Sequence, residues 1–270
     1  MRELLVRTLS GAVLVALVIG SILFSPLAYS VFLLFIVAIG TFEMGRLHGF
    51  EKGNLMSLVE FISLVSFAVT CAVALGFLTI KFLALDLILW VLPFLLALFS
   101  KQIKFPQIVA FAYGSLAFLS LPCSLMVFMY SDSLFGSLSG PTLILLVYAL
   151  MWANDTFAYL TGNLLGKHKL FERISPGKTI EGSLGGFLLT LGGFLVYNHY
   201  SQSLSIPFAI GLVLVAVVFG TLGDLCESML KRQAGVKDSG KLLPGHGGVM
   251  DRFDSVMFSV PFIFVYLLLI

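Results

Sequence analysis

Residues 223–255 read GDLCESMLKRQAGVKDSGKLLPGHGGVMDRFDS, and this is the most polar stretch of an otherwise apolar chain. It holds five acidic and five basic residues, while apolar segments lie directly before it, at 209–222, and directly after it, at 256–270. A membrane span needs about 20 consecutive, mostly apolar residues. The stretch is therefore expected to be a charged segment held between two membrane-spanning helices.

The composition of the whole chain supports a membrane setting. Of its 270 residues, 59% are hydrophobic and only 11% are charged, whereas soluble domains carry about 25% charged residues. We therefore expect an integral membrane protein that has the lipid bilayer, and no nucleic acid, as its partner.

Nine apolar segments of the chain approach the length of a span. Because a chain within lipid must satisfy its own backbone hydrogen bonds, each is expected to be a helix. The predicted fold is thus an all-α polytopic bundle of about nine transmembrane helices. The predicted spans are 8–25, 28–47, 56–78, 82–100, 106–130, 141–163, 183–199, 206–230 and 255–270.

The lysines and arginines predict how these spans are oriented. If the sides alternate across nine spans, 15 of the 16 basic residues fall on the side of the N-terminus, and only Lys81 falls on the other. Basic residues concentrate in cytoplasmic loops. We therefore expect a cytoplasmic N-terminus, an external C-terminus, and cytoplasmic loops at 164–182 and 231–254.

The same pattern predicts three functional parts. Residues 1–105 are interpreted as scaffold helices, 106–140 as a middle helix with an external loop suited to dimerisation, and 141–270 as the catalytic region.

Several ionisable residues lie inside or at the edge of predicted spans, where a charge usually faces a polar cavity. Asp155 lies in the middle of a span, beside Asn154. Asp224 and Glu227 are three residues apart and so share one face of a helix. Glu43 is also three residues from Arg46, so an ion pair within the helix is as reasonable for it as a functional role.

Carboxylates and bases together predict a chemistry. Asp251 and Asp254 share a helix face if the last span begins there, and with Asp224 and Glu227 they could converge at the membrane surface. Hard oxygen ligands of this kind suit Mg²⁺, which binds a few carboxylates together with substrate phosphates. The neighbouring bases could neutralise phosphate oxygens. These residues predict metal-assisted phosphoryl or nucleotidyl transfer at the cytoplasmic face.

The residues of the polar stretch also resemble a known signature. Ser228-x-x-Lys231-Arg232-x₄-Lys237-Asp238-x-Gly240, followed by Pro244-Gly-His-Gly-Gly-x-x-Asp251-Arg-x-Asp254, is similar to the pattern of phosphatidate cytidylyltransferases, also called CDP-diacylglycerol synthases. The resemblance extends to Asn154-Asp155, to the loop 175–182 and to Gly223-Asp224. It covers the C-terminal half of the chain, whereas the first 140 residues match only as hydrophobic spans.

The resemblance implies the transfer of CMP from CTP to phosphatidic acid, which gives CDP-diacylglycerol and pyrophosphate. It implies a requirement for Mg²⁺, with a second metal ion left open, and a homodimer in the inner (cytoplasmic) membrane. The bases would bind the phosphates of CTP and lipid, and His246 would orient or protonate the pyrophosphate.

Site residues are assigned on this basis. The expected metal ligands are Asp224, Asp251 and Asp254. The other expected catalytic residues are Asp155, Glu227, Lys231, Arg232, His246 and Arg252. The expected substrate-binding residues are Asn154, Ser175, Lys178, Thr179, Ser228, Lys237, Asp238, Gly245, Gly247 and Gly248.

Other functions remain open at this point. An enzyme that uses CTP on another lipid, such as a polyprenyl alcohol kinase or an ether-lipid cytidylyltransferase, would differ only in its acceptor. A transporter also uses carboxylates within the membrane, but it would be expected to show paired repeats with broken helices in both halves. Here the polar residues gather in one half of the chain.

Overall fold

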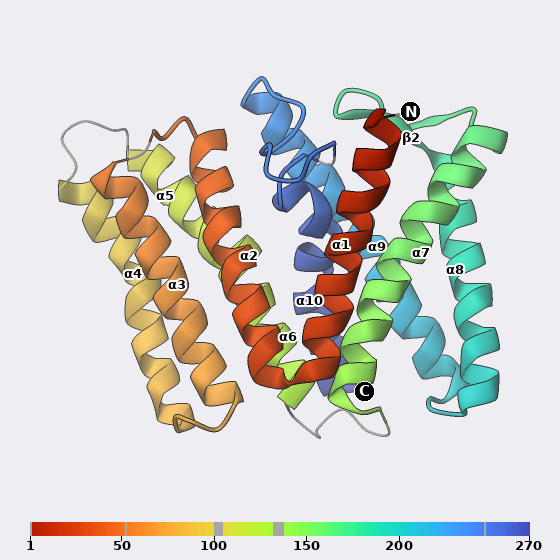
Figure 1. Cartoon of the computed structure of the whole chain (residues 1–270), viewed down its shortest axis with the longest axis horizontal. Helices are drawn as coiled ribbons and strands as arrows, with labels where there is room; N and C mark the ends of the chain where they lie inside the picture. The colour runs from red at the N-terminus through yellow and green to blue at the C-terminus, as the bar shows by residue number, and fades with distance from the viewer. Residues whose placement is uncertain (1, 52, 100–104, 132–137, 246) are drawn as a thin grey trace. The chain divides into compact units, whose positions relative to one another are not determined.

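The computed structural model describes residues 2–51, 53–99, 105–131, 138–245 and 247–270, and most of them are helical (Figure 1). Within these ranges, nine helices are long and apolar enough to span a membrane. This confirms the predicted all-α polytopic architecture. The structure adds one feature, a two-stranded antiparallel hairpin formed by β1 Lys169–Phe171 and β2 Ser175–Thr179. The orientation of the termini across the membrane stays a prediction.

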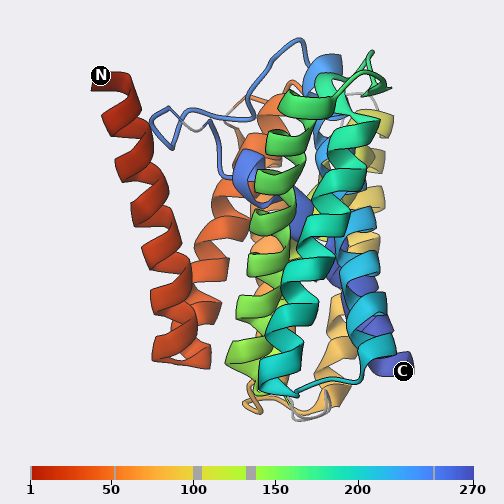
Figure 2. The same ribbon diagram turned by 90° about the vertical axis from the view of Figure 1, so that its right-hand side faces the viewer.

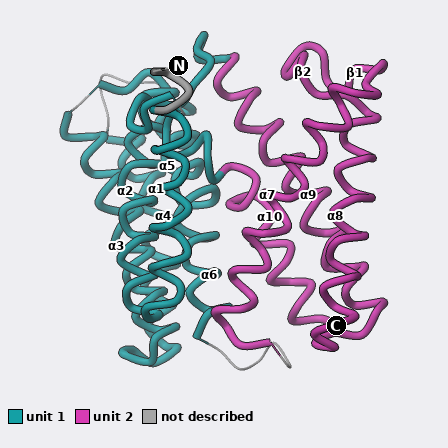
Figure 3. Tube along the Cα trace, turned by 45° about the vertical axis from the view of Figure 1, so that its right-hand side comes forward, with its two compact units in different colours: residues 1–132, 233–253 teal, residues 133–232, 254–270 magenta. Residues whose placement is uncertain are grey.

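The chain divides into two compact units (Figure 3), one formed by residues 1–132 and 233–253, the other by residues 133–232 and 254–270. The helices of the first unit are α1 Arg2–Phe24, α2 Pro26–Leu47, α3 Asn54–Ala74, α4 Leu83–Phe99, α5 Phe105–Ser115 and α6 Leu121–Ser131. A 3₁₀ turn, η1 Ile80–Phe82, precedes α4, and a π-helical turn, η2 Leu116–Ser120, joins α5 to α6. The predicted division into three functional parts stays a prediction.

The helices of the second unit are α7 Gly140–Leu165, α8 Ile180–Ser201, α9 Ile206–Gln233 and α10 Met250–Leu269. The last residue of α9 and the first four residues of α10 belong to the first unit. The hairpin connects α7 to α8, and Figure 1 shows it at the opposite end of these helices from the C-terminus.

The predicted spans agree with the observed helices to within six residues. The largest difference is at the start of α1, which begins at Arg2 and not at residue 8. Two smaller differences have local causes. The helix α3 ends at Ala74, not at residue 78, because Gly76 adopts a φ of 77°. The amides of Gly76 and Phe77 donate to the carbonyls of Val73 and Ala72, at 3.0 and 2.8 Å, as in a Schellman C-cap. The apolar residues beyond the cap extended the predicted span.

The other difference is that α10 begins at Met250, five residues before the predicted span. Its first turns carry Asp251, Arg252 and Asp254, which an apolar pattern excludes from a span. A helix tolerates acidic residues in its first turn because they interact favourably with the helix dipole. The last span is therefore a full 20 residues long.

Small residues set the packing in the second unit. The helices α7 and α8 lie side by side along their lengths (Figure 2). A Cβ placed at Gly182 would lie 2.8 Å from the carbonyl oxygen of Ala158 and 3.0 Å from the Cα of Gly162. A Cβ at Gly186 would lie 2.8 Å from the Cβ of Ala158. Glycine at these positions lets the two backbones approach closely, as is common between membrane helices.

Candidate active site

Glycine also brings α9 against α10. A Cβ placed at Gly223 would lie 2.9 Å from the carbonyl oxygen of Asp254 and closer still to the Cβ of Phe258. Farther along, the rings of Phe219 and Phe262 stack with centroids 3.6 Å apart. The two helices are therefore in direct contact at the residue that precedes Asp224.

This contact gathers three carboxylates. Asp224, Glu227 and Asp254 each offer an oxygen, and these oxygens lie within 4.8 Å of one another. Glu227 is 2% exposed and Asp254 is 8% exposed. Asp224 and Glu227 share one face of α9, as their spacing predicts. Burying several like charges together is costly unless cations offset them.

Two lysines supply part of that compensation. The ammonium of Lys178, from β2, forms an ion pair with Asp224, and Lys231 pairs with Glu227 at 2.5 Å. Ser228 donates to the other carboxylate oxygen of Asp224 at 3.3 Å. The result is a mixed acidic and basic cluster in which every member comes from a predicted site position.

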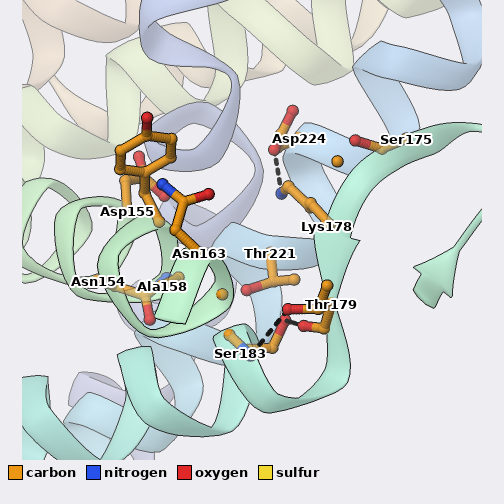
Figure 4. Close-up of a pocket in the computed structure, with 14 residues that line it drawn as sticks. Asn154, Asp155, Ala158, Asn163, Ser175, Lys178, Thr179, Ser183, Thr221 and Asp224 are labelled. Atoms are coloured by element: carbon orange, nitrogen blue, oxygen red, sulfur yellow. Dashed lines mark hydrogen bonds and ion pairs between the residues drawn. The ribbon is translucent and has the colours of Figure 1, made fainter. Parts of the chain in front are cut away.

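A polar cavity of about 400 Å³ adjoins the cluster, between α7, α8, α9 and β2 (Figure 4). Figure 4 shows the ion pair of Lys178 and Asp224 at this cavity. The predicted residues in its lining are Asn154, Asp155, Ser175, Lys178, Thr179 and Asp224.

Asn154 is the most enclosed polar group of the cavity. The residue is 6% exposed, and its Oδ1 has no hydrogen-bond partner among the residues that the structure describes. Buried amide groups are usually hydrogen-bonded. Asn154 is therefore a group that a polar ligand in this cavity could satisfy.

The hairpin that carries Lys178 is tied down at both ends. Thr179 caps α8, since its Oγ1 accepts from the amide of Gly182 at 3.1 Å. Glu181 accepts from the amides of Lys167 and His168, at 3.0 and 3.1 Å, and contacts the His168 ring at 2.6 Å. These contacts place β2, and with it Lys178, beside α9.

The loop that precedes α10 belongs to the first unit. Gly245 and Gly247 have φ values of 74° and 84°, a region that glycine enters without strain. Asp251 accepts from the amide of Gly248 at 2.7 Å and from the amide of Ser239 at 2.9 Å. Asp251 thus braces the loop and is not a member of the group formed by Asp224, Glu227 and Asp254, so its role as a metal ligand stays a prediction.

Basic residues of this loop line a second cavity. Lys237 and Asp238, both predicted to bind substrate, line a space of about 350 Å³ together with Arg46 and Lys241. Three cations and one carboxylate make this cavity a favourable place for an anion.

A comparison with known proteins identifies the family. A model of the family described as "Cytidylyltransferase family" matches residues 5–270. The chain belongs to the cytidylyltransferase family. It is 47% identical over 126 residues to a phosphatidate cytidylyltransferase of Staphylococcus aureus (strain COL). The aligned residues make up 46% of this chain and 48% of that protein. It is also 47% identical over 130 residues to one from Staphylococcus epidermidis, 48% of this chain and 50% of that protein. The matched region thus spans about half the length of these curated relatives.

The predicted residues not yet discussed are Arg232, Arg252 and His246. Arg232 donates from Nε to the carbonyl of Ile174 at 3.4 Å, which ties the end of α9 to the hairpin. Arg252 is exposed in the first turn of α10. His246 lies outside the described residues.

Sequence reasoning missed several residues that the cytidylyltransferase fold brings to the site. Asn163, Ser183 and Thr221 line the larger cavity. The position of Thr221, three residues before Asp224 on α9, was a signal that could have identified it.

Residues of the N-terminal helices α1 and α2 contact the loop that precedes α10. Arg7 donates from Nε to the carbonyl of Gly245, and Ser10 donates to that of Pro244, both at 3.0 Å. Glu43 contacts the same loop and forms no ion pair with Arg46 among the described residues. No local pattern indicates these contacts, because each joins residues more than 190 positions apart.

Proposed function

We propose that this cytidylyltransferase transfers CMP from CTP to phosphatidic acid in a Mg²⁺-dependent reaction at the cytoplasmic face of the membrane. The products would be CDP-diacylglycerol and pyrophosphate. The main support is the convergence of Asp224, Glu227 and Asp254 with Lys178 beside a polar cavity, in a chain built of membrane-spanning helices. The names of the curated relatives point to the same reaction.

The acidic group fits a divalent cation. Its three carboxylate oxygens lie within 4.8 Å of one another, and Mg²⁺ prefers oxygen ligands and completes its shell with substrate phosphates. In the proposal Asp224 and Asp254 hold the ion, together with Asp251, as the sequence predicts. When bound, the ion would neutralise negative charge on the phosphates.

The protein's own cations would bind and orient the two substrates. A phosphate oxygen of phosphatidate attacks the α-phosphorus of CTP, and the bond from that phosphorus to the oxygen bridging the α and β phosphates breaks. The attacking oxygen is already anionic, so the reaction needs no strong general base. Lys178, Lys231 and Arg232 would stabilise negative charge on the phosphates, because preorganised cations act strongly in an enclosed site.

Other predicted residues complete the proposed site. Lys237 and Arg252 would contact phosphate, and His246 would orient or protonate the departing pyrophosphate. The polar cavity would hold substrate through residues of α7 and β2, namely Asn154, Asp155, Ser175 and Thr179.

The proposed setting follows from the two substrates. CTP is soluble, whereas phosphatidate keeps its acyl chains in the bilayer and presents its phosphate at the level of the head groups. The basic residues predict that the site faces the cytoplasm. We place the enzyme in the inner membrane as a homodimer.

The experiment that tests the activity uses the purified full chain in lipid nanodiscs, with CTP labelled at the α-phosphate, Mg²⁺ and a panel of lipid acceptors. Labelled CDP-diacylglycerol and free pyrophosphate, formed with phosphatidic acid alone, are the expected result. A CDP-lipid formed only from an ether lipid, or a monophosphorylated polyprenol with release of CDP, would replace the proposal by one of the alternative CTP-dependent reactions. Absence of any product with every acceptor would refute it.

A further inference from the structure

A buried glutamate of α2 binds the loop that leads into α10. Glu43 is 3% exposed. Its Oε1 accepts from the amide of Val249 at 2.9 Å, and its Oε2 accepts from the amide of Met250 at 2.9 Å and from Ser239 Oγ at 2.8 Å. Both oxygens of a carboxylate in the N-terminal part of the chain are thus used by residues near its C-terminal end.

These amides are the donors that a helix cannot satisfy by itself. The first four N–H groups of a helix have no partner within the helix, and a side-chain oxygen at the N-cap usually accepts one of them. The residue that precedes α10 is Val249, which has no such oxygen. Glu43 supplies the missing acceptor from another helix, and its negative charge also suits a helix N-terminus.

The surrounding loop is shaped to admit this carboxylate. A Cβ placed at Gly240 would clash with Glu43, and one at Gly248 would lie 2.5 Å from both carboxylate oxygens. Ser239 lies between Glu43 and Asp251. Its Oγ is 2.8 Å from a carboxylate oxygen of Glu43 and 3.1 Å from one of Asp251, and it can donate to either. The two glycines of the signature therefore leave space for a side chain of α2.

We infer that Glu43 is a positioning residue for the reaction: it holds Ser239, Val249 and Met250, and so fixes where α10 begins. Asp254 follows Met250 by about one turn of the same helix, so the start of α10 sets the axial position of that acid. Lys237 and Lys241, in the same connection between α9 and α10, line a cavity together with Arg46. This inference rests on the proposed function, and it assigns a role to the N-terminal helices.

The test compares Glu43→Gln with Glu60→Gln, the same change on α3. Glutamine keeps the size of the side chain but replaces one acceptor oxygen by a donor, which would face an amide. We expect the Mg²⁺ concentration for half-maximal turnover to rise by about 10–100-fold in E43Q, as for other outer-shell changes, and to be unchanged in E60Q. A merely structural role would lower the amount of folded protein without shifting this concentration.

A second readout needs neither metal nor activity. Trypsin cleavage after Lys237 and Lys241 in the Mg²⁺-free protein should be about tenfold faster, or more, in E43Q, because losing hydrogen bonds to a buried charged group favours local opening. If the wild type makes no CDP-lipid while E43Q still opens the loop, the proposed function fails and the anchoring role stands. If E43Q matches the wild type in both measurements, the inference is wrong. Should E43Q fail to fold, Ser239→Ala, which removes one of the three hydrogen bonds, carries the same test.

Discussion

At the scale of single residues, Asp254 shows how burial and charge combine in the site. The residue is 8% exposed, and its carboxylate lies with those of Asp224 and Glu227 in one group. Lys178 forms an ion pair with Asp224, and Lys231 pairs with Glu227. Three carboxylates gathered in one buried group are costly for the fold but favourable for a cation.

We predict that Asp254→Asn lowers Mg²⁺-dependent turnover by at least about 100-fold, the upper end of the losses seen for outer-shell changes. The substitution keeps the shape of the side chain and removes one of three neighbouring negative charges. The thermal unfolding temperature of the metal-free protein should therefore be unchanged or higher, because substitutions in an active site often raise stability while they lower activity. Glu172→Gln, on the exposed tip of the hairpin, is the control. Wild-type turnover in D254N would rule out Asp254 as a ligand.

At the scale of elements, the contact between α9 and α10 decides whether the acids can meet. Gly223 has no room for a Cβ, because a methyl group there would press on Phe258 and on the backbone of Asp254. Gly192 on α8 is also in the interior of a helix, but a Cβ there would have nothing within 4 Å. The two glycines make a matched pair, one in a close contact and one in open space.

We predict that Gly223→Ala separates α9 from α10, lowers turnover at least about tenfold and destabilises the fold by about 1–3 kcal/mol, as overpacking does. Gly192→Ala should leave turnover unchanged and stabilise by up to about 1 kcal/mol, because alanine favours a helix. Turnover and thermal unfolding of both variants in nanodiscs check this. Equal behaviour of the two variants would show that the close contact at Gly223 does not hold the site together.

At the scale of the whole molecule, the basic residues predict which side of the membrane carries the polar loops. The hairpin between α7 and α8 should be cytoplasmic, and the short connection between α8 and α9 should be external. Gly177 in the hairpin and Ser203 in the connection report on these two sides, since a Cβ at Gly177 would meet nothing within 4 Å.

We predict that, in a variant with Cys71, Cys123 and Cys226 replaced by alanine, Ser203→Cys reacts with a membrane-impermeant maleimide in right-side-out vesicles. Gly177→Cys should react only after the vesicles are opened. The physical reason is that basic loops are retained on the cytoplasmic side during insertion. The extent of labelling before and after opening is the measurement, and the reverse pattern would overturn the proposed orientation and the cytoplasmic site.

The nine spans, their approximate ends and the gathering of acids and bases in one polar segment could all be predicted from the amino-acid sequence. These properties are local, because transfer of a helix into lipid depends on the residues of that helix alone. Asp224, Glu227 and Asp254 lie together, as the notion of shared helix faces allowed, while Asp251 accepts from the amides of Ser239 and Gly248, and the roles of all four acids stay predictions. The contact of Glu43 with the start of α10 is visible only in the folded structure. Such contacts join distant parts of the chain wherever small residues let helices and loops approach. The periodicity of the sequence does not indicate which distant side chain will occupy the space beside a glycine.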